Sequence, residues 1–135
     1  MGQHTVSRSF RFCYGHRIPG HAGPCRHLHG HSAKVEVVCQ GELDELGMVV
    51  DFARIKEVVE GWALAHLDHR MILMRGDPLV DVLEAQGEPV FVMEGSPTAE
   101  NMAALLFSAA TRAGLPVVRV RLWESETSMA SYEGP

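Results

Sequence analysis

Residues 29–39 read HGHSAKVEVVC, and apolar and polar side chains alternate along them. One set of alternate positions holds His29, His31, Ala33, Val35, Val37 and Cys39, and the other holds Ser32, Lys34, Glu36 and Gln40. Side chains two residues apart lie on the same face of a strand. The stretch therefore predicts a half-buried antiparallel strand whose inward face carries two histidines.

A second alternating stretch comes shortly before the first. Residues 7–16 read SRSFRFCYGH, in which Phe10, Phe12, Tyr14 and His16 share one parity. This pattern predicts a strand with an aromatic face, and the glycine- and proline-bearing loop RIPGHAGPCRH joins it to the next strand. Cys13 falls on the outward side of its strand and Cys39 on the inward side of the next, and we interpret both as small packed residues.

The rest of the chain predicts two helices and further short strands. Asp51 is a candidate N-cap for a helix that extends to about Leu67. Ser96-Pro97-Thr98 opens a second helix with proline in its first turn, and Gly114 ends it. Short strands are expected over 89–93 and 118–123. The order β-β-α-(β)-α-β indicates an α+β fold.

Length and composition restrict the class of protein. The chain has 135 residues, 46% of them hydrophobic and 21% charged, so we expect a single domain over residues 1–135. An odd number of cysteines, three, and an N-terminus without the apolar core of a signal peptide favour free thiols in the cytoplasm. The sequence has no run of about 18 apolar residues, so no membrane span is expected. A core this small makes a homo-oligomer the default expectation.

The charge of the chain bears on its partners. A formal net charge of −5 argues against a nucleic-acid partner, which requires a basic face. Arg17 and Arg26 nevertheless lie close to the histidines in the sequence. A local binding site for a small anion near these arginines is therefore an alternative that the sequence does not exclude.

The histidines at 29 and 31 have the spacing of a metal site. Side chains at i and i+2 of a strand are about 6.6–7 Å apart, so two imidazoles can converge on one ion at roughly 2.0–2.1 Å. His16 ends the neighbouring strand with the same inward parity. Three imidazoles with an open fourth position are typical of catalytic zinc, whereas an H-x-H pair alone also fits a polar surface. His4, His21 and His27 are interpreted as residues outside the site.

Other candidates have roles that the residues alone leave open. Cys25 is either a fourth ligand that closes the metal site or a reactive thiolate. Asp68 beside His69 is either a proton-transfer pair or a helix-terminal cap with a surface histidine. Glu124 ends the last strand in the sequence WESETS, and nothing in this pattern favours it over Glu126.

Six motifs occur in order along nearly the whole chain. They are F-x-F…G-H-R (Phe10 to Arg17), C-x-x-L-H-G-H-S (Cys25 to Ser32), G-M-V-V-D-F (Gly47 to Phe52), L-D-H (Leu67 to His69), P-T-A-E-N (Pro97 to Asn101) and E-x-x-x-x-x-x-x-Y (Glu124 to Tyr132). Each fragment is weak alone, but the ordered set resembles the 6-pyruvoyl-tetrahydropterin synthase / 6-carboxy-tetrahydropterin synthase family. The resemblance implies the tunnelling fold, a four-stranded antiparallel sheet with two helices on one face. In that family, trimers close their sheets into a barrel, and two trimers stack into a hexamer.

The resemblance also implies the roles of the site residues. Zinc would be held by His16, His29 and His31, Cys25 would be the proton-abstracting thiolate, Asp68 and His69 would relay protons, and Glu124 would anchor the pterin ring beside Thr98. The active site would lie between subunits.

The substrate implied is 7,8-dihydroneopterin triphosphate. The carboxy-forming branch of the family releases acetaldehyde and triphosphate and serves 7-deazapurine (queuosine-type) synthesis, whereas the pyruvoyl-forming branch releases only triphosphate and serves tetrahydrobiopterin-type chemistry. The four-residue step from Cys25 to His29 favours the carboxy-forming branch. The chain departs from the family pattern at Cys13-Tyr14-Gly15, at Arg70, and in a long linker over 71–96.

Two functions from other classes are alternatives. One is a pterin-binding protein without turnover, against which Cys25 and the pair Asp68–His69 argue, because binding alone requires neither. The other is a cupin-like metalloprotein, against which the two expected helices argue.

Overall fold

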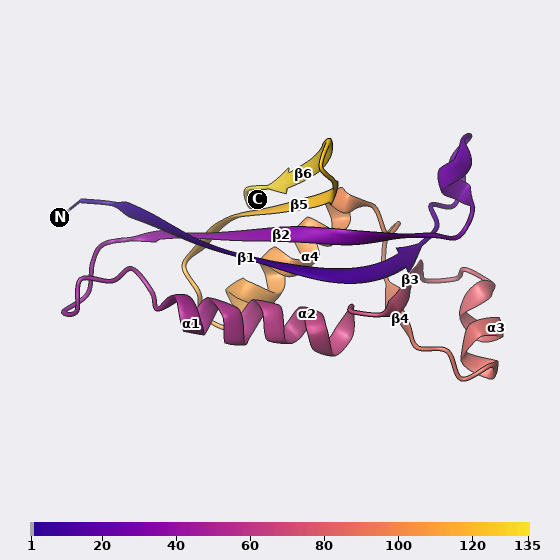
Figure 1. The fold of residues 1–135 in the computed structure, drawn as a ribbon, viewed down its shortest axis with the longest axis horizontal. Coiled ribbons are helices and arrows are strands. Elements are labelled where there is room, and N and C mark those ends of the chain that lie inside the picture. Colours follow the sequence, from indigo (N-terminus) through magenta and orange to yellow (C-terminus); the bar gives the residue numbers. More distant parts are fainter. Residues whose placement is uncertain (1) are drawn as a thin grey trace.

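The computed structural model describes residues 2–135, in which one sheet is flanked by helices (Figure 1). The strands are β1 (His4–His16), β2 (His29–Gly41), β3 (Arg70–Met74), β4 (Val90–Met93), β5 (Val117–Ser125) and β6 (Ser128–Tyr132). The helical segments are η1 (Pro24–Arg26), α1 (Phe52–Ile55), η2 (Lys56–Glu60), α2 (Gly61–His66), α3 (Leu79–Ala85) and α4 (Ala99–Arg112). None of the helices in this part of the chain has the length and apolarity that crossing a membrane requires.

The centre of the sheet is the hairpin of β1 and β2. The two strands pair antiparallel from His4 opposite Gly41 to His16 opposite His29. The predicted alternation is confirmed, since the inward positions Phe10, Phe12, Tyr14, Ala33, Val35, Val37 and Cys39 are buried. Cys13 is exposed, as its outward parity predicts, so its interpretation as a packed residue is wrong, whereas Cys39 is packed in the core. His4, which we interpreted as lying outside the site, is the first residue of β1, at the end of the strand away from His16.

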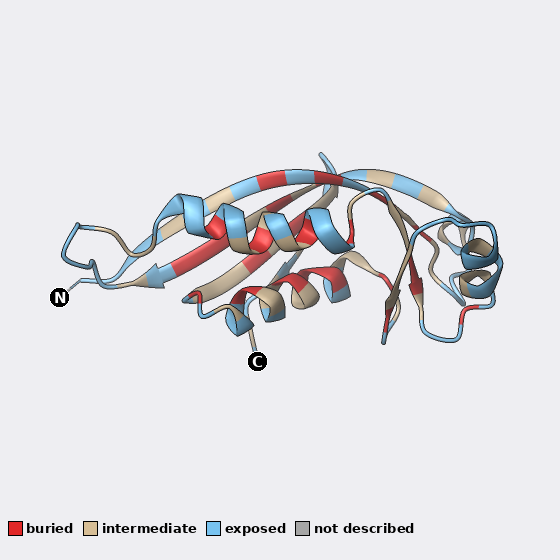
Figure 2. Cartoon of the chain, turned by 90° about the horizontal axis from the view of Figure 1, so that it is seen from below, coloured by how far each residue is buried: buried red, intermediate tan, exposed pale blue. Residues whose placement is uncertain are grey.

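The first predicted helix is present as a continuous helical path from α1 through the π-helical turn η2 to α2. Asp51 caps it, as expected, because its carboxylate accepts a hydrogen bond from the Ala53 N–H at 2.8 Å. The side chains that are fully buried along this path are Ile55, Val59, Ala63 and Leu67. They belong to the same core cluster as the inward residues of β1 and β2, and their spacing of four residues is that of one helix face. Figure 2 shows buried segments recurring along this helical path.

The second predicted helix is α4, which lies on the same face of the sheet as α1 and α2 (Figure 2). Its start differs from the prediction: Thr98 is the N-cap and accepts from the Asn101 N–H at 3.1 Å. Pro97 therefore precedes the cap rather than lying in the first turn. Met102, Ala103, Leu106 and Ala110 are its buried residues.

The expectation of four antiparallel strands is wrong. The sheet has six strands in the order β4-β3-β1-β2-β5-β6, and β3 runs parallel to both β1 and β4. The helix α3 lies in the crossover that connects β3 to its parallel neighbour β4. Of the additional elements, the sequence predicts only the strand at 89–93. The run RMILM of β3 is too short and too uniformly apolar to be assigned by periodicity.

An ion pair ties the loop after β1 to the turn before α3. Arg17 Nε donates to Asp77 Oδ2 at 2.9 Å, and its Nη2 donates to Oδ1. The Asp77 side chain is only 2% exposed and also accepts from the Leu79 N–H at 2.9 Å. The hydrogen bonds from Arg17 hold the pKa of Asp77 below its usual value, although burial acts in the opposite direction.

Replacing the Asp77 carboxylate tests how much its ion pair with Arg17 contributes to the free energy of unfolding. We expect Asp77→Asn to lower the free energy of unfolding by about 3 kcal/mol at pH 7, because it leaves Arg17 without its partner. The folded pKa lies below the unfolded value of about 3.9, so the contribution is present above that pH and is lost as the pH falls through the folded pKa. Urea unfolding at pH 7 and at pH 3 measures both effects.

Asp81→Asn is the matched control, since Asp81 is exposed on α3 and has no ion pair among residues 2–135. Its effect should stay within about 0.5 kcal/mol. A destabilisation by Asp77→Asn that is equally large at both pH values would contradict the role given to the charge.

Candidate active site

Three histidines meet where β1 ends and β2 begins. The register places His16 opposite His29, and His31 follows two residues later on the same face. One ring nitrogen from each lies within 4.8 Å of those from the other two. The ring centroids are 4.5 Å apart for His16 and His29 and 5.2 Å apart for His16 and His31. The predicted convergence of these three side chains is confirmed.

Backbone carbonyls orient two of the rings. His16 Nδ1 lies 2.6 Å from the carbonyl oxygen of Pro97, and His29 Nδ1 lies 2.7 Å from that of His27. A carbonyl oxygen can only accept, so each Nδ1 carries the proton and each Nε2 keeps a free lone pair. Burial lowers the pKa of His16, which favours the neutral ring.

The nitrogens that face one another lack protein partners. The Nε2 atoms of His16 and His31 are buried and have no hydrogen-bond partner among residues 2–135. Unpaired buried polar atoms are rare and costly. Three imidazoles whose ring nitrogens converge are a donor set that fits zinc and leaves a coordination position open. The donor set therefore fits a metal ion, and in the described residues it does not include Cys25.

Glu124 is the carboxylate nearest to these histidines. Its Oε2 lies 3.7 Å from His31 Nε2, and its Oε1 lies 4.0 Å from His16 Nε2. The Tyr14 hydroxyl donates to Oε1 over 3.5 Å. Because lone pairs and a carboxylate repel one another, a cation among them would stabilise the arrangement. The choice between Glu124 and Glu126, which the sequence leaves open, is made by the tertiary structure: Glu124 lies beside the histidines, whereas Glu126 follows the end of β5 and lines a different cavity.

Glu124 and Thr98 line one cavity of about 500 Å³ between the loop after β1, the start of α4 and β6. The resemblance implies that both residues line one pocket, and in the structure both line this cavity. Thr98 also has a structural role as the N-cap of α4. His21, which we interpreted as lying outside the site, lines the same cavity.

Asp68 and His69 form a pair at the other side of β1. Asp68 Oδ1 accepts from the Cys13 N–H at 2.9 Å, and Oδ2 lies 2.9 Å from His69 Nδ1. Burial acts to raise the pKa of Asp68, but these two contacts lower it below the usual value. His69 has a left-handed φ of 58° and a side chain that is 79% exposed. A strained backbone of this kind is typical of functional positions.

This pair is not joined to the histidine cluster within the chain. His69 lines a cavity of about 400 Å³ together with Cys13 and Glu88. In residues 2–135, no hydrogen bond or ion pair connects Asp68 or His69 to the three histidines. The Cys25 thiol is half-buried in η1, and it too makes no such contact; its backbone carbonyl accepts from the Ile18 N–H.

The structure adds two residues that sequence reasoning did not assign to the site. Tyr14 is buried beside Glu124, and its ring meets that of His16 edge-on at 5.1 Å. The sequence signal that could have identified Tyr14 is its inward parity on β1, between Phe12 and the candidate ligand His16. Arg75 joins Arg17 and Arg26 around a cavity of about 490 Å³. No local pattern indicates Arg75, because β3 brings it there.

Comparison with known proteins agrees with this geometry. The family model described as 6-pyruvoyl tetrahydropterin synthase matches residues 5–135. A 6-carboxy-5,6,7,8-tetrahydropterin synthase of Rickettsia bellii is 41% identical over 100 residues, which are 72% of either chain. The enzyme of the same name from Haemophilus influenzae is 31% identical over 137 residues, which cover 95% of this chain and 97% of the relative.

Solved structures share the fold. An uncharacterized protein of Wolinella succinogenes superposes with a TM-score of 0.82 at 27% identity and covers 100% of both chains. The 6-pyruvoyl tetrahydropterin synthase of Caenorhabditis elegans superposes with a TM-score of 0.77 at 24% identity, covering 100% of this chain and 98% of its own. The chain is therefore a lyase-type enzyme that belongs to the 6-pyruvoyl tetrahydropterin synthase family.

Proposed function

We propose that the protein converts 7,8-dihydroneopterin triphosphate into 6-carboxy-5,6,7,8-tetrahydropterin, acetaldehyde and triphosphate. Water is consumed, and the bond between the first two side-chain carbons breaks. The observation that carries the proposal is the convergence of three imidazoles beside Glu124, in which the Nε2 atoms of His16 and His31 are buried without a hydrogen-bond partner in residues 2–135. The names of the Rickettsia bellii and Haemophilus influenzae relatives support the carboxy product.

The metal site would be formed by His16, His29 and His31. A zinc ion held there would act as a Lewis acid toward the side-chain hydroxyls of the substrate. Glu124 would accept hydrogen bonds from the guanidine-like edge of the pterin ring, and charge-assisted bonds of this kind are the stronger ones. Thr98 lines the same cavity and would border the ring.

Proton transfer would fall to Cys25 and to the pair Asp68–His69. Asp68 holds the His69 ring at Nδ1, so Nε2 remains to exchange a proton with the substrate. Because this pair lines a cavity away from the histidine cluster, we propose that a neighbouring protomer supplies it. The outer edges of β4 and β6 have no strand partner in residues 2–135. Pairing at such edges would build the barrel-forming trimer of the tunnelling fold, or a hexamer made of two trimers.

The triphosphate would leave toward the cavity of Arg17, Arg26 and Arg75. Arg17 is held by Asp77, so its guanidinium is already positioned when phosphate oxygens arrive. Guanidinium groups suit phosphate because they donate two parallel hydrogen bonds. The three free cysteines are compatible with the reducing cytoplasm in which we place the enzyme, and the 7-deazapurine pathway is the one its product would serve.

The product separates this proposal from its rivals. We expect metal-loaded protein incubated with 7,8-dihydroneopterin triphosphate to yield the carboxy-tetrahydropterin and acetaldehyde in equal amounts, read by mass spectrometry. A pyruvoyl-tetrahydropterin without acetaldehyde would instead assign the tetrahydrobiopterin-type reaction. Retention of unchanged substrate by metal-loaded protein would indicate a binding protein without turnover.

Cys25→Ala is the informative variant for this assay, with Cys13→Ala as its control. The first should keep its metal and lose turnover, because the thiol transfers a proton but is not a ligand. Cys13 lies on the opposite parity of β1, and its contact with Asp68 is made by its backbone N–H, which the substitution keeps, so we expect its variant to react like the unmodified protein. Loss of metal in Cys25→Ala would make the thiol a ligand.

Metal content tests the histidine cluster directly. We expect His29→Ala to lower zinc affinity on the order of 100-fold or more, since even loss of a second-sphere partner costs 10–100-fold. His27→Ala should bind normally, because its contribution to the site is a backbone carbonyl that the substitution retains. Elemental analysis after dialysis against graded chelator measures both variants, and equal retention of zinc by the two would exclude His29 as a ligand.

Tyr14 should position Glu124 for the pterin. In residues 2–135, the Tyr14 hydroxyl is the side-chain group that donates a hydrogen bond to Glu124. Burial and the charge of Glu124 raise the pKa of Tyr14, so the hydroxyl stays protonated. We expect Tyr14→Phe to raise the KM for the pterin roughly threefold to tenfold with little change in kcat or zinc content. Tyr132→Phe, which alters a ring packed on Phe107, is the control, and a fall in kcat alone would contradict a positioning role.

A further inference from the structure

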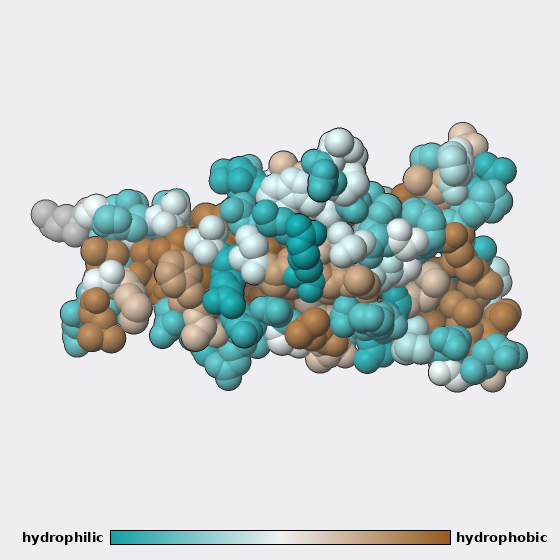
Figure 3. Space-filling model, in the orientation of Figure 1, coloured by the Kyte–Doolittle hydropathy of each residue, from teal (hydrophilic) through white to brown (hydrophobic). Residues whose placement is uncertain are grey.

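The face of the sheet opposite α2 and α4 carries a row of long side chains in register. Arg11 of β1 lies opposite Lys34 of β2, and Lys34 lies opposite Trp123 of β5. All three have the outward parity, so they are separated from the histidine cluster by the sheet itself. Figure 3 views this face and shows hydrophilic side chains gathered across its middle.

Two of the cations in this row lack partners. Elsewhere on the same face, Arg121 pairs with Glu36 at 3.1 Å and Arg119 pairs with Glu133 at 3.3 Å. Arg11 and Lys34 make no ion pair and no side-chain hydrogen bond in residues 2–135. Like charges directly opposite one another on neighbouring strands destabilise a sheet. An anion bound between Arg11 and Lys34 would therefore reduce the repulsion between these two positive charges.

The aromatic ring beside them holds one of the two cations. Lys34 Nζ lies 5.1 Å from the centroid of the Trp123 ring, which is within the range of a cation–π interaction. The contact stabilises the ammonium but adds no negative charge. The ammonium therefore remains available to an anion, and its withdrawal from the ring would change the surroundings of the indole.

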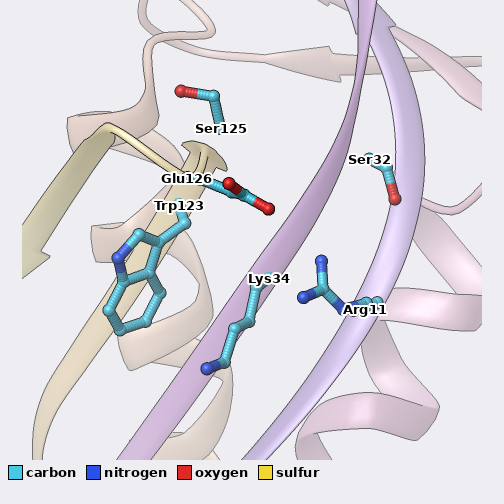
Figure 4. A pocket seen from close by; sticks show the side chains of 6 residues that line it. All are labelled: Arg11, Ser32, Lys34, Trp123, Ser125 and Glu126. Carbon is cyan, nitrogen blue, oxygen red and sulfur yellow. The ribbon is translucent and has the colours of Figure 1, made fainter.

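A cavity of about 370 Å³ lies against this row (Figure 4). Its lining comprises Arg11, Ser32, Lys34, Trp123, Ser125 and Glu126. Ser32 and Ser125 have short side chains that leave space beside the long side chains of Arg11, Lys34 and Trp123. The serine hydroxyls can also donate hydrogen bonds. Glu126 is the single carboxylate of the lining, and it lies beyond ion-pair distance of either cation in the described residues. The two cations and one carboxylate leave the cavity with a net positive charge.

We propose that this cavity binds a phosphate-type anion, held by Arg11, Lys34 and Ser32. A guanidinium offers two parallel donors to phosphate oxygens, an ammonium adds a compact charge, and the hydroxyl supplies a further donor. The site does not depend on the proposed reaction, since Glu124 and the histidines lie on the opposite face. An oligophosphate and a single phosphoryl group share this chemistry.

The fluorescence of Trp123 reports on the site. The chain has two tryptophans, so full-length Trp62→Phe protein leaves Trp123 as the only indole. We expect inorganic triphosphate, added at low ionic strength, to change its emission in a saturable way as Lys34 moves toward the anion. Orthophosphate is titrated in parallel: tighter binding of triphosphate assigns an oligophosphate, and equal binding assigns a single phosphoryl group. Calorimetric titration of both anions measures the same affinities without the indole.

Charge variants of matched kind test the assignment. Arg11→Gln and Lys34→Gln should each weaken binding roughly tenfold, and Glu126→Gln should strengthen it about threefold by removing a like charge. Arg121→Gln removes the same charge from the same face outside the cavity, and its affinity should stay within about twofold. Absence of saturation with both anions, or equal weakening by Arg121→Gln and Lys34→Gln, would overturn the proposal. Turnover of the pterin plays no part in any of these readouts.

Discussion

The antiparallel register between β1 and β2 is the constraint on which the rest of the structure depends. It is held by a core in which Phe10 and Val35 face each other across the strands and are almost fully buried. The free energy of burying that apolar face selects one register among those the backbone could form. The same register places His16 opposite His29. The histidines are therefore brought together by the packing of apolar side chains that take no part in the reaction.

Main-chain contacts then set how the imidazoles point. The Pro97 carbonyl that binds His16 comes one residue before Thr98, the residue that caps α4. The orientation of a metal ligand on β1 is thus coupled to the way a helix begins some eighty residues later in the chain. Burying His16 and partly burying His29 and His31 costs free energy, and the carbonyl contacts of His16 and His29 offset part of that cost while leaving their opposite nitrogens free.

Much of this arrangement follows from periodicity, and the remainder depends on pairing between distant segments. A period of two is sufficient to assign the faces of β1 and β2, and thereby the three histidines, because parity is a local property. Parity alone could not choose Glu124 over Glu126, since that choice depends on how β5 aligns with β2. The strand β3 was not predicted because RMILM shows no alternation of apolar and polar residues. The approach of Arg75 to Arg17 and Arg26 was missed for the same reason, since Arg75 directly follows β3. The separation of His69 from the cluster is likewise a property of the tertiary structure, to which the motif L-D-H gives no clue.

The alternation of faces along the central hairpin also limits how such a protein can diverge. A single inserted residue within β1 or β2 would turn every side chain beyond it to the other face, exchanging imidazoles for residues such as Arg11 or Lys34. The loop between the two strands has no such restriction, because its length costs little once its ends are joined. Over evolutionary time, changes in length should therefore collect between residues 17 and 28, while the two strands are inherited as one indivisible unit.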